Sequence, residues 1–308
     1  MNRIGVISNP YSKQNRKHPH RLEKLRELVP ERSLAVFPST IPEMDGALEK
    51  MRSECVNIIA INGGDGTVHI ALSRLISIFG KDKLPDIAVL KGGTMNQTAT
   101  NLKIRGNTFS ILKRIVEKSK KKDSFSTTPI PLLCVDGNKY GFMCGTGSVV
   151  DFMDIYHSSG NPSPVSAMKA IFKLASSAVV KGHYFKKLFN PQEYVFKVND
   201  YSYRPGKYIA SMISTLKQVG LGFELMHRAR QNKGAHFLAF HETPGVLMHM
   251  IRAWKGLSLP PDTVDDAVGK SFTVHSETSF RYTLDGDIYS SEGTLKIETG
   301  PEINIVTE

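Results

Sequence analysis

The stretch Gly-Gly-Asp-Gly-Thr at residues 63–67 has the composition of a phosphate-binding turn, because three glycines surround one carboxylate. Glycine has no Cβ, so phosphate oxygens can approach its backbone N–H group closely. A helix expected to begin near Val68 would direct the positive end of its dipole to the same place. Since the Asp65 carboxylate would repel phosphate, we expect Mg²⁺ between them, held by carboxylate, phosphate oxygens and water. The alternative is an ordinary strand-to-helix turn with an aspartate cap.

Two other polar turns follow apolar runs in the same way. Residues 92–96 read Gly-Gly-Thr-Met-Asn, and residues 9–15 read Asn-Pro-Tyr-Ser-Lys-Gln-Asn. Each kind of turn is common by itself, but the carboxyl edge of a parallel sheet is where ligands bind in open α/β folds. We therefore expect the three turns to converge on one ligand.

The first part of the chain alternates between apolar runs and amphipathic segments, which predicts a doubly wound α/β domain. Continuous apolar strands that alternate with such helices are typical of a parallel sheet covered on both faces. The predicted strands are residues 3–9, 33–39, 56–62 and 85–92, and the predicted helices are residues 18–29, 42–54, 68–79 and 107–120.

The pattern changes near residues 122–129, where a lysine run gives way to Ser, Thr and two prolines. We predict two domains, residues 1–128 and residues 129–308, and expect the last segment to be able to return to the first. The second domain has short alternating runs and hairpin-like turns, which predicts an antiparallel β-rich, sandwich-like fold. Two helical stretches, residues 166–182 and 245–256, interrupt it.

Charge and composition limit the class of protein. The 40 Lys and Arg residues exceed the 29 Asp and Glu residues, so the net charge is +11, which favours anionic partners. Cys55, Cys134 and Cys144 have neither zinc-ligand nor disulfide spacing, which indicates a reducing compartment. The N-terminus lacks an apolar signal region, and no run of about 18 apolar residues is present. We expect a cytoplasmic protein.

Basic and aromatic residues interleave at residues 179–189, where Lys186 and Lys187 follow Tyr184 and Phe185. Such a stretch can lie at an anionic membrane interface, where each nearby Lys or Arg contributes about 1 kcal/mol. The alternative is a solvated helix end whose aromatic side chains face the core. We expect peripheral membrane association, and no nucleic-acid partner, because no nucleic-acid motif is present. The sequence leaves open whether two copies of the chain form a homodimer.

The motif series resembles the catalytic-domain family of diacylglycerol kinases, which includes the sphingosine and ceramide kinases. The matching pieces are NPYS, GGDGT, GGTMNQTA, CGTGSVVDF and LDGD, in family order. GGDGT alone is shared with NAD kinases and phosphofructokinases. The phosphate-binding motif G-x-x-x-x-G-K-[ST] is absent, and residues 145–150 lack the third glycine of a dinucleotide fingerprint.

The resemblance implies a phosphofructokinase- or NAD-kinase-like first domain, with ATP in a cleft between two domains. It implies transfer of the γ-phosphoryl group to a hydroxyl of diacylglycerol or a related lipid. Asp65 would act through Mg²⁺ or on the acceptor hydroxyl. Of Asp285 and Asp287, one would take the acceptor's proton, and Asp287 joins Asp65 as a candidate Mg²⁺ ligand. LDGD alone is more commonly a hairpin turn. The implied nucleotide-binding residues are Asn9, Ser12, Lys13, Gly63, Gly64, Asp65, Gly66, Thr67, Gly92, Gly93, Thr94 and Asn96.

Four positions depart from the family pattern. Lys13 replaces a glycine, Gln97 an aspartate, Lys233 an aspartate that holds a structural metal in some members, and Asp287 a glutamate. These departures indicate an atypical member. They leave open a catalytically silent regulator that binds nucleotide or lipid. The shared GGDGT motif leaves open a soluble kinase of the NAD kinase type.

Overall fold

The computed structural model describes residues 2–93, 96–121, 123–158, 190–220, 223–242, 252, 257–260 and 263–307. The chain divides into two compact units: Met1–Leu132 with Pro301–Glu308, and Leu133–Gly300. The division falls within strand β5 (Thr127–Val135), the strand that also contains the boundary predicted after residue 128. The predicted α/β fold followed by a β-rich part is confirmed.

The first unit contains a parallel sheet in the order β4-β3-β1-β2. Every residue of β1 and β3 is buried, as expected for strands covered on both faces. The end of β16 joins the same sheet, where Ile305 pairs in parallel with Ile87. The strands are β1 (Ile4–Ser8), β2 (Ala35–Val36), β3 (Ile58–Gly63), β4 (Asp86–Lys91) and β16 (Thr294–Val306).

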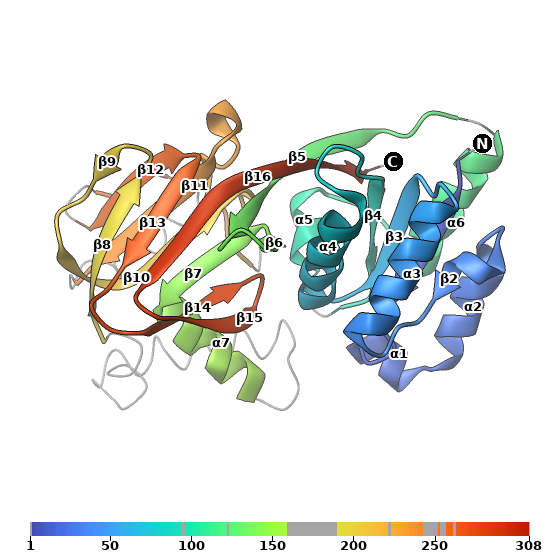
Figure 1. The fold of residues 1–308 in the computed structure, drawn as a ribbon, viewed down its shortest axis with the longest axis horizontal. Coiled ribbons are helices and arrows are strands. Elements are labelled where there is room, and N and C mark those ends of the chain that lie inside the picture. Colours follow the sequence, from blue (N-terminus) through green and yellow to red (C-terminus); the bar gives the residue numbers. More distant parts are fainter. Residues whose placement is uncertain are drawn as a thin grey trace. The chain divides into compact units, whose positions relative to one another are not determined.

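Helices cover both faces of this sheet (Figure 1). Helix α3 packs against α4, and α2 packs against α6. Because crossover connections between parallel strands are right-handed, these two pairs lie on opposite faces. Helix α6 buries Ile111, Leu112, Ile115 and Val116 toward the sheet. The helical elements are α1 (Lys13–Lys17), α2 (His20–Leu28), η1 (Arg32–Leu34), α3 (Ile41–Ser53), α4 (Asp65–Phe79), α5 (Gln97–Asn101) and α6 (Thr108–Lys121).

The first unit differs from the sequence prediction in three places. The strand predicted at residues 33–39 has only two residues, because a 3₁₀ turn occupies its start. Helix α4 begins at Asp65 rather than near Val68, which places the carboxylate in the first helical turn. Helices α1 and α5 were not predicted, because five residues are too few to show helical periodicity.

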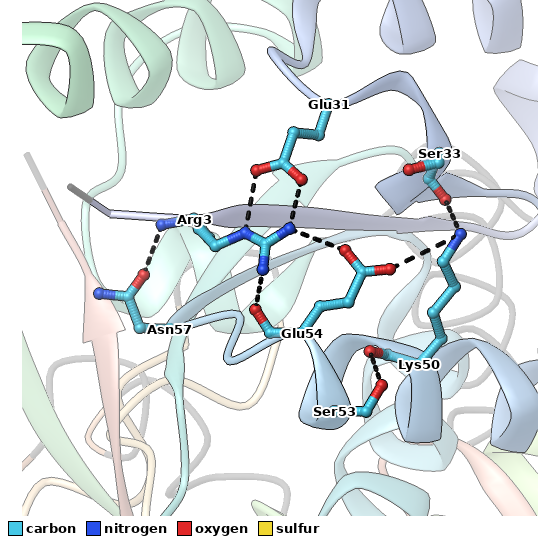
Figure 2. A network of polar contacts seen from close by, with 7 residues as sticks. All are labelled: Arg3, Glu31, Ser33, Lys50, Ser53, Glu54 and Asn57. Carbon is cyan, nitrogen blue, oxygen red and sulfur yellow. Dashed lines mark hydrogen bonds and ion pairs between the residues drawn. The ribbon is translucent and has the colours of Figure 1, made fainter.

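A polar network fixes the start of β1 (Figure 2). The Arg3 guanidinium donates from Nε to Glu31 at 2.9 Å and from Nη2 to Glu54 at 2.8 Å. The backbone N–H of Arg3 donates to Asn57 Oδ1 at 2.8 Å. The hydrogen bond from Arg3 lowers the pKa of Glu31. This network ties β1 to η1 and to the end of α3.

The second unit is built from antiparallel strands around an aromatic core. Strand β10 pairs with β7, β8 and β11, while β14 pairs with β7 and β15. Tyr194, Phe196, Tyr208 and Phe237 are fully buried in this core. The elements are β6 (Lys139–Gly141), β7 (Met143–Gly147), α7 (Ser148–Ser158), β8 (Gln192–Val198), β9 (Tyr201–Ser202), β10 (Gly206–Ser214), η2 (Gln231–Lys233), β11 (Ala235–His241), β12 (Val264–Gly269), β13 (Ser271–His275), β14 (Phe280–Leu284) and β15 (Asp287–Ser291).

Strand β12 and helix α7 were not predicted from the sequence. The helix predicted at residues 166–182 and the basic aromatic stretch at 179–189 lie outside the described residues, as does almost all of the helix predicted at 245–256. Within the described part of the chain, none of the helices combines the length and apolar character needed to span a bilayer.

Candidate functional site

Three predicted turns lie at one edge of the first unit's sheet. Ser8 pairs with Asn62 across β1 and β3, and Gly63 pairs with Lys91 across β3 and β4. The turns that follow these strand ends are therefore neighbours, because parallel strands in register end at the same edge. We call them the first turn (residues 9–12), the second turn (residues 63–67) and the third turn (residues 92–96).

Asn9 joins the first turn to the second. Its side-chain Nδ2 donates to Thr67 Oγ1 at 2.9 Å, and its backbone N–H donates to Asn62 O at 3.0 Å. Its Oδ1 accepts from the backbone N–H of Tyr11 at 2.8 Å. The amide of Asn9 thus shapes its own turn and holds the second turn at the same time.

The second and third turns pack so closely that a side chain would not fit between them. A Cβ added to Gly93 would lie 2.3 Å from Gly64 Cα, and a Cβ added to Gly92 would lie 2.3 Å from Asn62 Oδ1. A Cβ on Gly63 would lie 2.4 Å from Thr67 Cβ. Close packing thus explains why these positions are glycine. The sequence analysis considered only the close approach of phosphate.

Asp65 is the first residue of α4, and its carboxylate is directed at the start of α5. Oδ1 accepts from the backbone N–H of Thr98 at 3.4 Å. Burial raises the pKa of Asp65, while backbone N–H groups of Gln97, Thr98 and Asn96 act in the opposite direction. The residue keeps part of its surface accessible, yet the surrounding turns are dense enough for burial to dominate. Asp65 is thus an acidic group in a site that resists its ionisation.

Ser12 and Lys13 begin the helix that follows the first turn. Ser12 is the N-cap of α1 and is buried, and within the described part of the chain its Oγ has no hydrogen-bond partner. Lys13 is the first residue of α1 and is partly exposed. A hydroxyl without a partner at this end of the first turn can donate to a ligand oxygen.

Asn96 closes the third turn. Its Oδ1 accepts from the backbone N–H of Gly93 at 3.0 Å, and its Nδ2 donates to Gly93 O at 3.2 Å. It adopts the left-handed conformation, with φ of 49°, which asparagine tolerates better than most residues. Gln97 follows as the first residue of α5, and Thr94 lies outside the described residues.

Asp285 and Asp287 flank a tight hairpin in the second unit. Leu284 pairs with Asp287, and Asp285 and Gly286 have φ values of 50° and 97°, as in a type I′ turn. The Asp285 carboxylate accepts from the backbone N–H groups of Phe142 and Met143, each at 2.9 Å. Asp287 is partly exposed at the start of β15. The carboxylate of Asp285 therefore anchors the turn.

Sequence reasoning did not single out Ser8 and Asn62, which are both fully buried beside the turns. Asn62 Nδ2 donates to Ser8 Oγ at 2.7 Å. A usable signal was present, because Asn62 is an amide at the end of the otherwise apolar run 58–61. A polar residue in that place needs a partner in the fold.

Lys233, which stands where some family members have a metal-binding aspartate, lies in η2 with φ of 57°. Across the described ranges, no group of three or more His, Cys, Asp and Glu side chains is arranged to hold a metal ion.

Comparisons with known proteins agree with the motif series. Residues 3–126 match the family described as the diacylglycerol kinase catalytic domain. The comparison with curated proteins gave no match. A crystal structure of a diacylglycerol kinase from Bacillus anthracis str. Sterne is 14% identical with a TM-score of 0.69, covering 100% of this chain and 97% of that chain.

An NAD kinase from Archaeoglobus fulgidus, solved in complex with ATP, is 12% identical with a TM-score of 0.50, covering 98% of this chain and 93% of that chain. At such identities the two structures establish likeness of fold. The family match is different, because it spans all three turns and the strands that carry them. Residues 3–126 therefore match the diacylglycerol kinase catalytic-domain family, a kinase family, and the resemblance inferred from the motifs is confirmed.

Proposed function

We propose that this protein is a lipid kinase that transfers the γ-phosphoryl group of ATP to a hydroxyl of diacylglycerol or a related lipid. The observation that carries the proposal is the family match over residues 3–126, which contains the three adjoining turns. Phosphoryl transfer needs mainly positioning and charge stabilisation, so closely held turns of this kind suit the reaction.

The nucleotide phosphates would bind at the second turn. Helix α4 has 15 residues and begins within that turn, and its N-cap residue, Gly64, has no side chain to cap the first backbone N–H groups. Such an N-terminus attracts an anion. The Ser12 hydroxyl would donate to a phosphate oxygen, and the glycines of the second and third turns carry no Cβ that would keep phosphate from their backbone N–H groups.

Asp65 would hold Mg²⁺. A carboxylate whose pKa is raised by burial gains from a nearby cation, because the cation favours the ionised form. Magnesium prefers one or two carboxylates together with phosphate oxygens and water, which fits this donor set. When bound, Mg²⁺ neutralises charge on the phosphoryl oxygens.

Asp287 would take the proton of the acceptor hydroxyl. The Asp285 carboxylate already accepts from two backbone N–H groups, which favour its ionised form and make it a weaker base. Asp287 lies next to that fixed turn and keeps part of its surface exposed. A carboxylate in this role typically contributes about 10²–10⁴-fold to the rate.

The protein would associate peripherally with an anionic membrane surface and bind its lipid substrate there. The net charge of +11 supports this, because basic segments are attracted to anionic headgroups. A soluble kinase of the NAD kinase type is the second candidate, supported by the structural likeness to the NAD kinase solved with ATP.

Labelled ATP and Mg²⁺ with a panel of acceptors tests both candidates. The panel contains diacylglycerol, ceramide and sphingosine in anionic vesicles, together with soluble NAD. We expect wild type to produce labelled lipid and Asp65→Ala to be inactive. The control is Asp82→Asn, which changes an exposed acid in the same unit and should be fully active. Labelled NAD alone would favour the second candidate. Nucleotide binding without turnover of any acceptor would favour the silent regulator.

A further inference from the structure

Asn62 lies at the end of β3, one residue before the second turn, and its side chain is fully buried. Its Nδ2 donates to Ser8 Oγ at 2.7 Å and to Asn15 Oδ1 at 3.4 Å. Its backbone carbonyl accepts from the backbone N–H of Asn9 at 3.0 Å. Asn62 is thus connected both to the end of β1 and to the first turn.

Asn15 completes a closed set of hydrogen bonds around the first turn. Its Nδ2 donates to Asn9 O at 2.8 Å and to Ser8 Oγ at 3.1 Å, and the residue is 1% exposed. We call Ser8, Asn15 and Asn62 the buried amide cluster. The cluster holds the backbone carbonyl of Asn9 through the side chain of Asn15, while the backbone N–H of Asn9 donates to the backbone carbonyl of Asn62.

The third turn also rests on Asn62. The Oδ1 atom of Asn62 occupies the space that a side chain on Gly92 would need, 2.3 Å from the position of its Cβ. Among the described residues no donor reaches this oxygen. A buried carbonyl without a partner reduces stability, so the amide is poorly explained as a stabilising core residue. Its side-chain hydrogen bonds go to Ser8 and Asn15, which stand on either side of the first turn.

We infer that Asn62 is a positioning residue that fixes the first and third turns against the second, and thereby sets the affinity for nucleotide. The effect on nucleotide affinity rests on the proposed function, whereas the effect on the turns does not. An alanine at this position would remove the donor shared by Ser8 and Asn15 and the oxygen against Gly92. The strand would remain, because its backbone hydrogen bonds with β1 and β4 do not involve the side chain.

Amide hydrogen exchange of the full chain tests the positioning role directly. In Asn62→Ala we expect exchange at residues 9–16 and at residues 96–98 to be at least tenfold faster, with the strands of the sheet unchanged. Asn15→Ala should accelerate exchange at residues 9–16 alone, because its side chain bonds to Ser8, Asn9 and Asn62 and the first turn is the one turn among these contacts. The control is Ser211→Ala, which removes an equally buried side-chain hydrogen bond, to Thr146 in the second unit.

Calorimetry with Mg·ADP supplies the second readout. We expect Asn62→Ala to weaken binding about tenfold or more and Ser211→Ala to leave it unchanged. If both variants melt earlier but neither changes exchange at the turns, Asn62 is merely structural and the inference is overturned. If exchange at the turns rises but wild-type protein binds no nucleotide, the positioning role stands and the proposed function fails.

Discussion

The side-chain amide of Asn9 donates a hydrogen bond to Thr67 Oγ1 at 2.9 Å, which joins two motifs that lie 58 positions apart in the sequence. Both residues were expected to contact nucleotide. In the fold they contact each other, so a ligand that displaced either one would disturb both turns. The first and second turns therefore form one unit of structure.

Replacing Thr67 by valine should separate these turns, whereas replacing it by serine should not. Valine keeps the shape but leaves Asn9 Nδ2 without its acceptor, which should destabilise the fold by about 1 kcal/mol because the donor is partly buried. Serine retains the oxygen. We expect a lower melting temperature and a higher KM for ATP in Thr67→Val, with Thr67→Ser close to wild type. If the two variants had the same melting temperature and the same KM for ATP, the hydrogen bond to Asn9 would not be what holds the turns together.

The glycines of the turns are predicted to resist substitution by alanine. A Cβ on Gly92 meets Asn62 Oδ1 at 2.3 Å and the backbone N of Gly63 at 2.8 Å, so Gly92→Ala should destabilise by about 1–3 kcal/mol. Urea unfolding followed by circular dichroism measures this. Gly46 in α3 is the matched control, because a Cβ there meets nothing within 4 Å. Gly46→Ala should stabilise by about 0.5–1 kcal/mol; the same sign at both positions would contradict the packing argument.

The long elements of the first unit were predictable because burial on both faces leaves a clear sequence pattern. The run 58–61 is wholly apolar, and α4 repeats apolar residues at helical spacing. The direction of the Asp65 side chain was not predictable. It depends on α5, whose five residues are too short to carry a periodic signal, and on the left-handed residue Asn96.

Strand β12 shows a different reason for failure. Its sequence Val-Asp-Asp-Ala-Val-Gly places two acids side by side, unlike the apolar alternation of a strand. Adjacent strand residues point to opposite faces. Asp265 accepts from Tyr208 Oη at 2.7 Å, and Asp266 contacts His236 Nε2 at 3.1 Å. Partners that are distant in sequence thus make both acids compatible with the strand, and no local pattern reveals such partners.

Asp285 and Asp287 should respond differently to alanine. Asp285→Ala removes the acceptor of the Phe142 and Met143 N–H groups, which should cost about 1.5–3 kcal/mol for charge-assisted hydrogen bonds. Asp287→Ala should reduce stability less but lower kcat by about 10²–10⁴-fold if it supplies the base. Urea unfolding and initial rates with lipid acceptor measure the two effects. A fully active Asp287→Ala protein would refute its assignment as the base.

The network around Arg3 predicts a stability difference that depends on pH. Because the hydrogen bond from Arg3 lowers the pKa of Glu31 in the folded state, its contribution is present above the ordinary pKa of glutamate. It is lost as the pH falls through the lowered pKa, because the protonated carboxyl no longer pairs with the guanidinium. Glu31→Gln should therefore have a lower melting temperature than wild type at pH 7 and nearly the same melting temperature in strong acid.

Thermal melts of both proteins from neutral to acidic pH follow this difference. Glu27→Gln, the same change at an exposed position of α2, is the control and should show no such convergence. Added salt should also shrink the difference at pH 7, because both partners are partly exposed and exposed charges are screened. A difference that stays constant with pH would show that side-chain packing, not charge, is responsible.

Asp65 should illustrate a conflict between stability and activity. Its pKa is raised by burial, so its stabilising contribution is fully present below the unfolded-state pKa and is lost as the pH rises through the folded-state pKa. At pH 7 the buried charge is unfavourable. Asp65→Asn keeps an oxygen for the Thr98 N–H group without that charge, so we expect a higher melting temperature than wild type at pH 7 and a shrinking gain in acid.

Added Mg·ADP should reverse the order of the two proteins. A ligand that binds only the folded state raises stability by mass action, and Asp65→Asn loses the proposed Mg²⁺ ligand. Wild type should therefore gain more in melting temperature than the variant, which should also lack kinase activity. The control is Asp82→Asn, which removes an exposed acid and should follow wild type in both conditions. A variant that is less stable without ligand would mean that the Asp65 carboxylate stabilises α5 more than its burial disfavours it.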